Sequence, residues 1–222
     1  YSLLAADRAR ANGLKYMPQI HFYALRGDAG YPLTLIDAQV DVLWAHPAML
    51  GWYVADEPDG SFSGIYPPRL QEVYQHIEAH DLNKRPQFVV FYTPLVEAYL
   101  RAEPPLTHDI MMNDSYPCRV GIPEFGGSLW RVAAWTREQV LQCKIAGSKK
   151  AQVNVPQACG VNGWSDFRLP TFKEQRYLSY APIVEGARGL LWWDYGDAGD
   201  PSYVQGRAEY RANITGPIAT EI

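Results

Sequence analysis

Two neighbouring carboxylates stand where a strongly apolar stretch of the chain stops. Asp56 and Glu57 follow the run Gly51-Trp52-Tyr53-Val54-Ala55 and are followed at once by Pro58. Because proline has no backbone N–H and biases the residue before it to extended geometry, we expect a buried strand that ends at Glu57. Acids delivered to the end of such a strand are candidates for proton-transfer chemistry. The alternative is a helix N-cap, for which aspartate is favoured, but a cap needs one acid and not two.

Five further apolar runs end in polar or aromatic residues. The six runs occupy residues 14–22, 51–57, 87–92, 109–114, 151–157 and 189–195, and most of them begin about 40 residues apart, the step of a repeated βα unit. Helical signals lie between them: apolar periodicity over 37–50 and 68–82, capping boxes at Thr136-x-x-Gln139 and Thr171-x-x-Glu174, and stop signals at Gly147 and Gly186. This alternation predicts parallel strands.

Two α/β architectures fit this order, an open doubly wound sheet and a (β/α) barrel. No glycine-rich phosphate loop follows a strand, which disfavours the nucleotide-binding open sheet. The residues at the strand ends are Gln19, His21, Asp56, Glu57, Tyr92, Asp114, Tyr116, Gln157, Trp193 and Asp194. In a barrel such residues converge on one site. We therefore expect a (β/α)8 TIM barrel that is N-terminally incomplete, with the six strands as strands three to eight. Residues 1–222 would be a single catalytic domain and a fragment of a longer chain.

The run from Gly51 to Pro58 resembles the fourth-strand motif of clan A glycoside hydrolases, retaining TIM-barrel enzymes in which an Asn-Glu-Pro tripeptide carries the acid/base glutamate. The wider pattern, with Asp-x-Tyr-Pro at 114–117 and Gly-x-x-Trp-Trp-Asp-Tyr at 189–195, is also similar to uncharacterised barrel proteins named as glycoside hydrolases. The resemblance implies that Glu57 is the acid/base and that Asp56 replaces the asparagine. The chain departs from clan A at strand seven, where Gln157 stands in place of the nucleophile glutamate.

Glycoside hydrolysis needs a second carboxyl group, and Asp114 is the best candidate. It follows the apolar run Ile110-Met111-Met112-Asn113, so it should lie at the mouth of the barrel. The alternative is that Asp114 caps the next element or pairs with Arg119. Carboxyl groups about 5 to 5.5 Å apart would predict retention, and about 6.5 to 9.5 Å inversion. Burial beside Tyr53 and repulsion from another acid are expected to raise the pKa of Glu57.

The other strand-end residues are predicted to bind an oligo- or polysaccharide substrate. Amide and imidazole groups can bond to sugar hydroxyls, and tryptophan rings can stack on a sugar face. The predicted substrate-binding residues are His21, Asp56, Tyr92, Tyr116, Gln157, Trp164, Trp193 and Asp194. Core packing or loop capping is the alternative for each of them. Trp192 alternates with Trp193 and is predicted to face the helix layer.

Composition argues against several other classes of function. The chain has a formal net charge of -4 and no polybasic run, so neither nucleic acid nor a membrane surface is an expected partner. Its three cysteines are too few for a disulfide framework and lack zinc-site spacing. No apolar stretch reaches the length of about 20 residues that a membrane span needs. We expect no cofactor. The sequence carries no address signal, and a secreted or extracytoplasmic location is favoured.

Two rival functions stay open at this stage. One is a non-catalytic carbohydrate-binding protein on a glycosidase scaffold, which the glutamine at strand seven suggests. The other is a metal-dependent barrel enzyme, in which Asp56, Glu57, Asp59 and Asp114 would hold a divalent cation. His76 and His80, one helical turn apart, are predicted to lie on a solvated helix face. If the barrel is open, an exposed sheet edge makes pairing with another chain plausible.

Overall fold

The computed structural model describes residues 3–20, 22–28, 30, 32–60, 65, 67–94, 96–101, 107–148, 150–160, 166–193 and 210–222. The chain divides into two compact units, which are described separately below. The first comprises residues 1–112 and 142–151, and the second comprises residues 113–141 and 152–222. Among the described residues, no helix is both long and apolar enough to cross a membrane.

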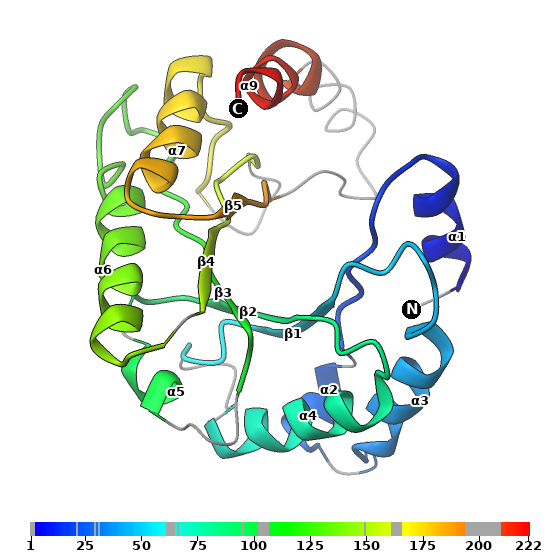
Figure 1. Cartoon of the computed structure of the whole chain (residues 1–222). Helices are drawn as coiled ribbons and strands as arrows, with labels where there is room; N and C mark the ends of the chain where they lie inside the picture. The colour runs from blue at the N-terminus through cyan, green and yellow to red at the C-terminus, as the bar shows by residue number, and fades with distance from the viewer. Residues whose placement is uncertain are drawn as a thin grey trace. The chain divides into compact units, whose positions relative to one another are not determined.

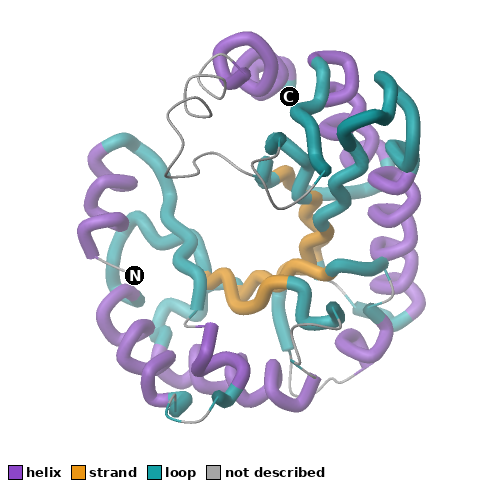
Figure 2. Tube along the Cα trace, turned by 180° about the vertical axis from the view of Figure 1, so that it is seen from behind, coloured by secondary structure: helices purple, strands orange, loops and turns teal. Residues whose placement is uncertain are grey.

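The five described strands form one sheet with the hydrogen-bonded order β1-β2-β3-β4-β5 (Figures 1 and 2). They are β1 (Trp52–Asp56), β2 (Gln87–Phe91), β3 (Ile110–Asn113), β4 (Ala151–Asn154) and β5 (Gly189–Leu190). β1 pairs in parallel with β2, and β4 pairs in parallel with β5. The predicted α/β class with parallel strands is confirmed. Closure into an eight-stranded barrel stays a prediction.

The predicted first strand, residues 14–22, is the main difference from the sequence analysis. In place of a continuous strand, the segment forms isolated parallel bridges from Tyr16 to Met49 and from Gln19 to Tyr53. Pro18 lies between the two bridges and has no N–H to donate, so a regular ladder is interrupted at this point. Its carbonyl still accepts a bond from Tyr53 N at 3.0 Å.

Among the described residues, five helices lie entirely within the first unit. They are α1 (Leu3–Ala11), α2 (Phe22–Arg26), α3 (Thr34–Leu43), α4 (Pro67–His80) and α5 (Glu97–Arg101). α3 and α4 pack together through the buried side chains Ile36, Val40, Leu70, Val73 and Ile77, which join one hydrophobic cluster with β1 and β2. α4 agrees closely with the predicted segment 68–82. α3 ends seven residues before the predicted limit because Pro47 excludes a helical continuation.

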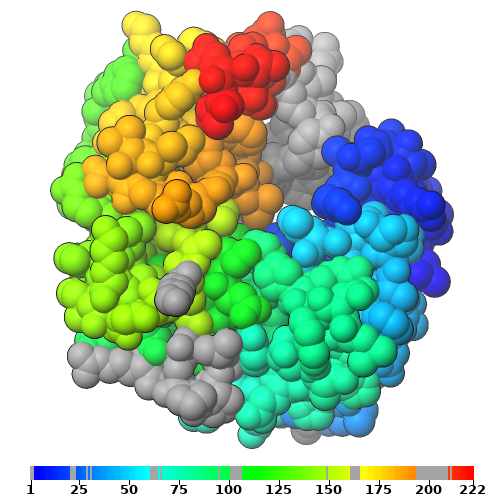
Figure 3. Space-filling model, viewed as in Figure 1, coloured from blue at the N-terminus to red at the C-terminus, as the bar shows by residue number. Residues whose placement is uncertain are grey.

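The second unit contains α7 (Phe172–Val184), the π-helical turn η1 (Arg211–Thr215) and α9 (Gly216–Glu221). α6 (Arg131–Ile145) belongs to it as far as Leu141. α9, red in Figure 3, packs on α7, yellow to orange in the same view, and Arg176 bonds to Glu221 at 3.0 Å.

One of the two predicted capping boxes is confirmed. Thr171 caps α7: its side chain accepts from Glu174 N while the Glu174 carboxylate accepts from Thr171 N. Thr136 is not a cap, because α6 already begins at Arg131 and the Thr136 hydroxyl donates to Val132 O at 2.8 Å inside the helix. Gly147 and Gly186 follow the ends of α6 and α7 with positive φ angles, as their predicted stop role requires.

Candidate functional site

Glu57 occupies a strained backbone position at the end of β1. Its φ angle is 45°, in the left-handed region that side chains other than glycine rarely adopt. The surrounding bonds hold it there: Glu57 N donates to Val90 O at 2.9 Å, and Gly60 N donates to Glu57 O at 2.9 Å. The side chain is half-buried. Such strain persists where the structure fixes it and is typical of functional sites, although Lys84 and Phe125 also have positive φ angles.

Asp56 is exposed and is bonded to the strand that carries it. Tyr53 Oη donates to Asp56 Oδ1 at 2.7 Å. Residues three apart on a regular strand point to opposite faces, but the pairing register of β1 with β2 shifts between Tyr53 and Ala55. This irregularity allows the phenol and the carboxylate to meet.

Asp59 fixes the chain that follows β2. Its carboxylate accepts from Tyr92 N and Thr93 N, each at 2.8 Å, and from Thr93 Oγ1 at 2.9 Å. The Asp59 oxygens therefore cap the neighbouring strand. Tyr92, a predicted substrate-binding residue, is thereby positioned with its side chain exposed.

In the second unit, Asp114 comes directly after β3 and is 8% exposed. The alternative partner considered for it, Arg119, forms an ion pair with Asp166 and lies over the Phe167 ring. Asp114 thus directly follows a strand, and its catalytic role stays a prediction.

Two of the predicted substrate-binding aromatics of the second unit are in contact. The rings of Tyr116 and Trp193 are stacked, with centroids 5.2 Å apart and planes at 19°. Phe167 meets the Tyr116 ring edge-on at 5.7 Å. We call these three residues the aromatic face. Trp192 behaves as predicted, because its Nε1 donates to Ser179 Oγ of α7 at 3.1 Å.

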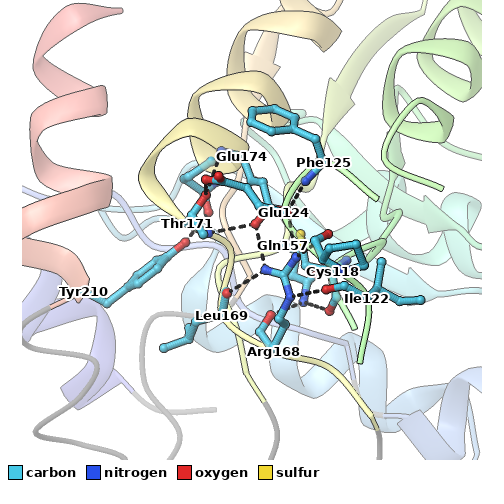
Figure 4. Close-up of polar contacts among 12 residues, drawn as sticks. Cys118, Ile122, Glu124, Phe125, Gln157, Arg168, Leu169, Thr171, Glu174 and Tyr210 are labelled. Atoms are coloured by element: carbon cyan, nitrogen blue, oxygen red, sulfur yellow. Dashed lines mark hydrogen bonds and ion pairs between the residues drawn. The ribbon is translucent and has the colours of Figure 1, made fainter. Parts of the chain in front are cut away.

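Gln157 is placed differently from its predicted role. It is fully buried, and its side-chain amide is occupied by backbone groups of the chain itself. Oε1 accepts from Cys118 N at 2.8 Å, and Nε2 donates toward the carbonyls of Cys118, Cys159 and Arg168 at 2.9–3.1 Å (Figure 4). These contacts describe a structural residue and do not support its predicted contact with sugar hydroxyls.

An ion pair between the half-buried Arg168 and the buried Glu174 lies next to Gln157. Arg168 binds Glu174 through two hydrogen bonds of 2.7 Å, and Glu174 also accepts from Thr171 N and Phe125 N (Figure 4). Burial acts to raise the pKa of the Glu174 carboxyl, but the bonds from Arg168 and from the two N–H groups outweigh it and lower the pKa to about 2. The capping box indicated Glu174, whereas no sequence signal indicated Arg168.

Two further observations limit the chemistry. Burial, then the negative charge of Glu174, raises the pKa of the Cys118 thiol to about 12, so this cysteine is not an activated nucleophile. Within the described ranges, no group of three or more His, Cys, Asp or Glu side chains is arranged to hold a metal ion. His76 and His80 bond instead to Asp37 and Asp41 on α3, at 2.8 and 2.7 Å.

Three predicted substrate-binding residues, His21, Trp164 and Asp194, lie outside the described residues. The remaining predicted residues, both catalytic and substrate-binding, are divided between the two units. Asp56, Glu57 and Tyr92 belong to the first unit, and Asp114, Tyr116, Gln157 and Trp193 belong to the second.

Comparison with known proteins gives structural neighbours. No protein-family model matches the chain, and no curated protein matches it. A solved structure described as "putative alpha-L-fucosidase", from Bacteroides thetaiotaomicron VPI-5482, is similar with a TM-score of 0.63 and 12% identity; the match covers 94% of this chain and 70% of the other. A β-glucuronidase from Ruminococcus gnavus, in complex with uronic deoxynojirimycin, is similar with a TM-score of 0.54 and 14% identity over 91% of this chain.

These neighbours carry glycosidase names. The chain therefore has a glycosidase-like fold. It spans only 37% of the length of the β-glucuronidase. At such low identities the similarity establishes the scaffold, and the site must be argued from the residues themselves.

Proposed function

We propose that this protein is a glycoside hydrolase in which Glu57 is the acid that protonates the leaving oxygen and Asp114 is the partner carboxylate. The observation that carries the proposal is the backbone at Glu57: the second of two adjacent acids, directly after a buried strand, is held at a φ angle of 45° on a glycosidase-like scaffold. Asp114, buried directly after β3, supplies the second acid that the reaction needs.

The proposed reaction divides the work between the two carboxyl groups. Glu57, protonated, gives its proton to the glycosidic oxygen as the bond to the anomeric carbon breaks. Asp114, ionised, acts in one of two ways. Either it attacks the anomeric carbon, and water then releases the sugar from Asp114 after giving a proton to the ionised Glu57, or it removes a proton from the water that attacks the anomeric carbon directly. The aromatic face, together with Asp56 and Tyr92, would bind the sugar rings. The scaffold for this arrangement would be a (β/α) barrel.

Hydrolysis of methyl glycosides tests the proposal, because a methanol leaving group needs the proton that Glu57 is proposed to give, whereas 4-nitrophenolate can leave without it. The panel includes the α-L-fucoside and the β-D-glucuronide, because the similar structures carry those names. General acid–base catalysis by one side chain contributes a factor of about 10² to 10⁴ to the rate. Glu57→Gln and Asp114→Asn are therefore each expected to lower kcat by a factor of about 10² or more. Glu72→Gln is the matched control, since Glu72 is an exposed partner of Arg69 on α4. Equal rates in the Glu57 variant and the control would refute the assignment.

The anomer released first, observed by NMR, would report whether the reaction retains or inverts configuration. A retained configuration assigns Asp114 as the nucleophile, and an inverted one assigns it as the base.

A second candidate, a carbohydrate-binding protein without turnover, is favoured by one observation. At the strand-seven position, where the family that the chain resembles carries its nucleophile, Gln157 is buried and bonded to the backbone. Binding of glycosides without hydrolysis by the wild type would establish this second function. A fall in activity on adding a chelator would instead reveal a metal-dependent reaction.

A further inference from the structure

Gln157 joins three segments of the second unit that are distant in sequence. Its Oε1 accepts from Cys118 N at 2.8 Å and its Nε2 donates to Cys118 O at 3.0 Å. The side-chain amide therefore bonds to both the N–H and the C=O of Cys118, as a residue of a neighbouring strand would. The same Nε2 reaches Arg168 O at 2.9 Å. Figure 4 shows the amide between these two segments. One side chain thus ties residue 118 to residue 168.

The backbone around Gln157 binds the third segment. Gln157 and Trp193 form a parallel bridge, in which Trp193 N donates to Pro156 O at 3.1 Å and Ala158 N donates to Trp193 O at 2.5 Å. The side chain and the main chain of the same residue therefore face different segments.

Each segment carries one ring of the aromatic face. Tyr116 is two residues before Cys118, Phe167 directly precedes Arg168, and Trp193 is bridged to Gln157 itself. The segments of Tyr116 and Phe167 are also joined directly, because Val120 N donates to Asp166 O and Arg168 N donates to Cys118 O. Gln157 connects this pair of segments to the one that carries Trp193.

Glutamine has the donors that this position requires. Three carbonyl oxygens lie around Nε2, and they share the two N–H donors of its NH₂ group. A carboxylate of the same shape has no donor, and it would place a charge against the carbonyls in a fully buried position. The departure from a glutamate at strand seven is thereby explained by the contacts in this chain.

The aromatic face is partly accessible. Trp193 is 36% exposed, and Tyr116 is half-buried beneath its stacked contact. Rigid aromatic surfaces at a polar border suit the apolar faces of sugar rings, and their affinity depends on the rings being held in place before the ligand arrives.

We infer that Gln157 is a positioning residue, which holds Trp193 against Tyr116 so that the aromatic face can bind a saccharide ring. This inference rests on the proposed function only for the class of ligand. The positioning itself is a property of the protein without ligand.

The test uses Gln157→Met, which keeps the length of the side chain and removes its hydrogen bonds. Two quantities are measured on the full chain: the near-ultraviolet circular dichroism, to which the Tyr116–Trp193 stack contributes, and the Kd for the glycoside of the panel that the wild type binds most tightly. The aromatic signal should fall, and Kd should rise about tenfold. Gln152→Met, the same change at another buried glutamine of this unit, should leave both unchanged.

A double-mutant cycle separates positioning from a general loss of structure. If Gln157 acts through Trp193, then Gln157→Met adds no loss of affinity in a Trp193→Ala background. Additive losses, or an unchanged aromatic signal in the single variant, would overturn the inference. Where the methionine variant does not fold, Gln157→Asn, which keeps the amide but shortens its reach, is expected to change both quantities in the same direction.

The outcomes also separate this inference from the proposed function. A wild type that binds the glycoside without hydrolysing it refutes the glycosidase, while the positioning role is still measured through Kd. A Gln157→Met variant with reduced kcat and unchanged Kd overturns the positioning role and leaves the glycosidase standing. A wild type that binds no glycoside of the panel overturns the saccharide ligand in both.

Discussion

The ion pair between Arg168 and Glu174 offers the sharpest test of the energetics of the second unit. The Glu174 side chain is 1% exposed and accepts two bonds of 2.7 Å from the guanidinium. A carboxyl pKa lowered from 4.5 to about 2 corresponds to about 3 kcal/mol of folding free energy, at about 1.4 kcal/mol per pH unit. Glu174→Gln is therefore expected to lower the free energy of unfolding by about 3 kcal/mol at neutral pH.

The same pair predicts a dependence on acid. Because the folded-state pKa is depressed, the stabilisation is fully present above pH 4.5 and is lost as the pH falls toward about 2. Urea denaturation at a series of pH values, followed by tryptophan fluorescence, measures this loss. The Glu174→Gln variant is expected to lose less stability between pH 4.5 and pH 2 than the wild type, because it lacks this carboxyl.

Glu185→Gln is the control for this prediction. Glu185 also accepts two bonds from an arginine, but Arg137 is 66% exposed, and exposed pairs contribute about 1 kcal/mol or less. Two results would show that burial of Glu174 does not determine what the ion pair contributes to stability. One is an equal loss of stability in the two variants, and the other is an unchanged pH dependence of stability below pH 4.5 in Glu174→Gln.

Three further predictions concern the first unit. Burial, then the charge of Lys150, lowers the pKa of His108 well below 6.5. The free energy of unfolding should therefore fall as the pH drops below 6.5, by up to about 1.4 kcal/mol per pH unit. Urea denaturation should show that the His108→Leu variant loses less stability over this pH range. The bond to Asp41 raises the pKa of His80, so the small stabilisation from this bond is present below pH 6.5 and is lost as the pH rises through the raised pKa. In the same assay, the His80→Gln variant should lack this pH-dependent part of the stability. Glu57→Gly should relieve the left-handed backbone and raise the free energy of unfolding by up to about 1 kcal/mol while abolishing hydrolysis; a loss of stability in calorimetry would contradict the strain.

Local sequence signals predicted the elements but not the contacts between distant segments. Thr171-x-x-Glu174 and Thr136-x-x-Gln139 have the same pattern, and only the first is a cap, because α6 already begins at Arg131 and Thr136 lies inside it. The alternation of Trp192 with Trp193 predicted correctly that Trp192 faces a helix. A period of two residues is a property of the strand itself, so it can be read without tertiary information.

Gln157 shows why the site was harder to predict than the fold. Its main partner, Cys118, is 39 residues away, and a polar residue at a strand end has the same sequence signal whether it faces a ligand or the backbone. For a similar reason, the sequence did not show that the described part of residues 14–22 forms only isolated bridges at positions 16 and 19. An apolar run indicates burial but not how many hydrogen bonds the strand makes with its neighbour.

The carboxylate of Asp59 has a consequence for the kind of ligand that the end of β2 can accept. Consecutive N–H groups at the end of a strand form a ready cradle for a phosphate, a sulfate or a ligand carboxylate. Here Tyr92 N and Thr93 N already hold an internal anion, at 2.8 Å each. These two N–H groups are therefore already bonded within the chain, so in the proposed site a sugar beside Tyr92 would be held through the exposed phenol ring and not through these amides.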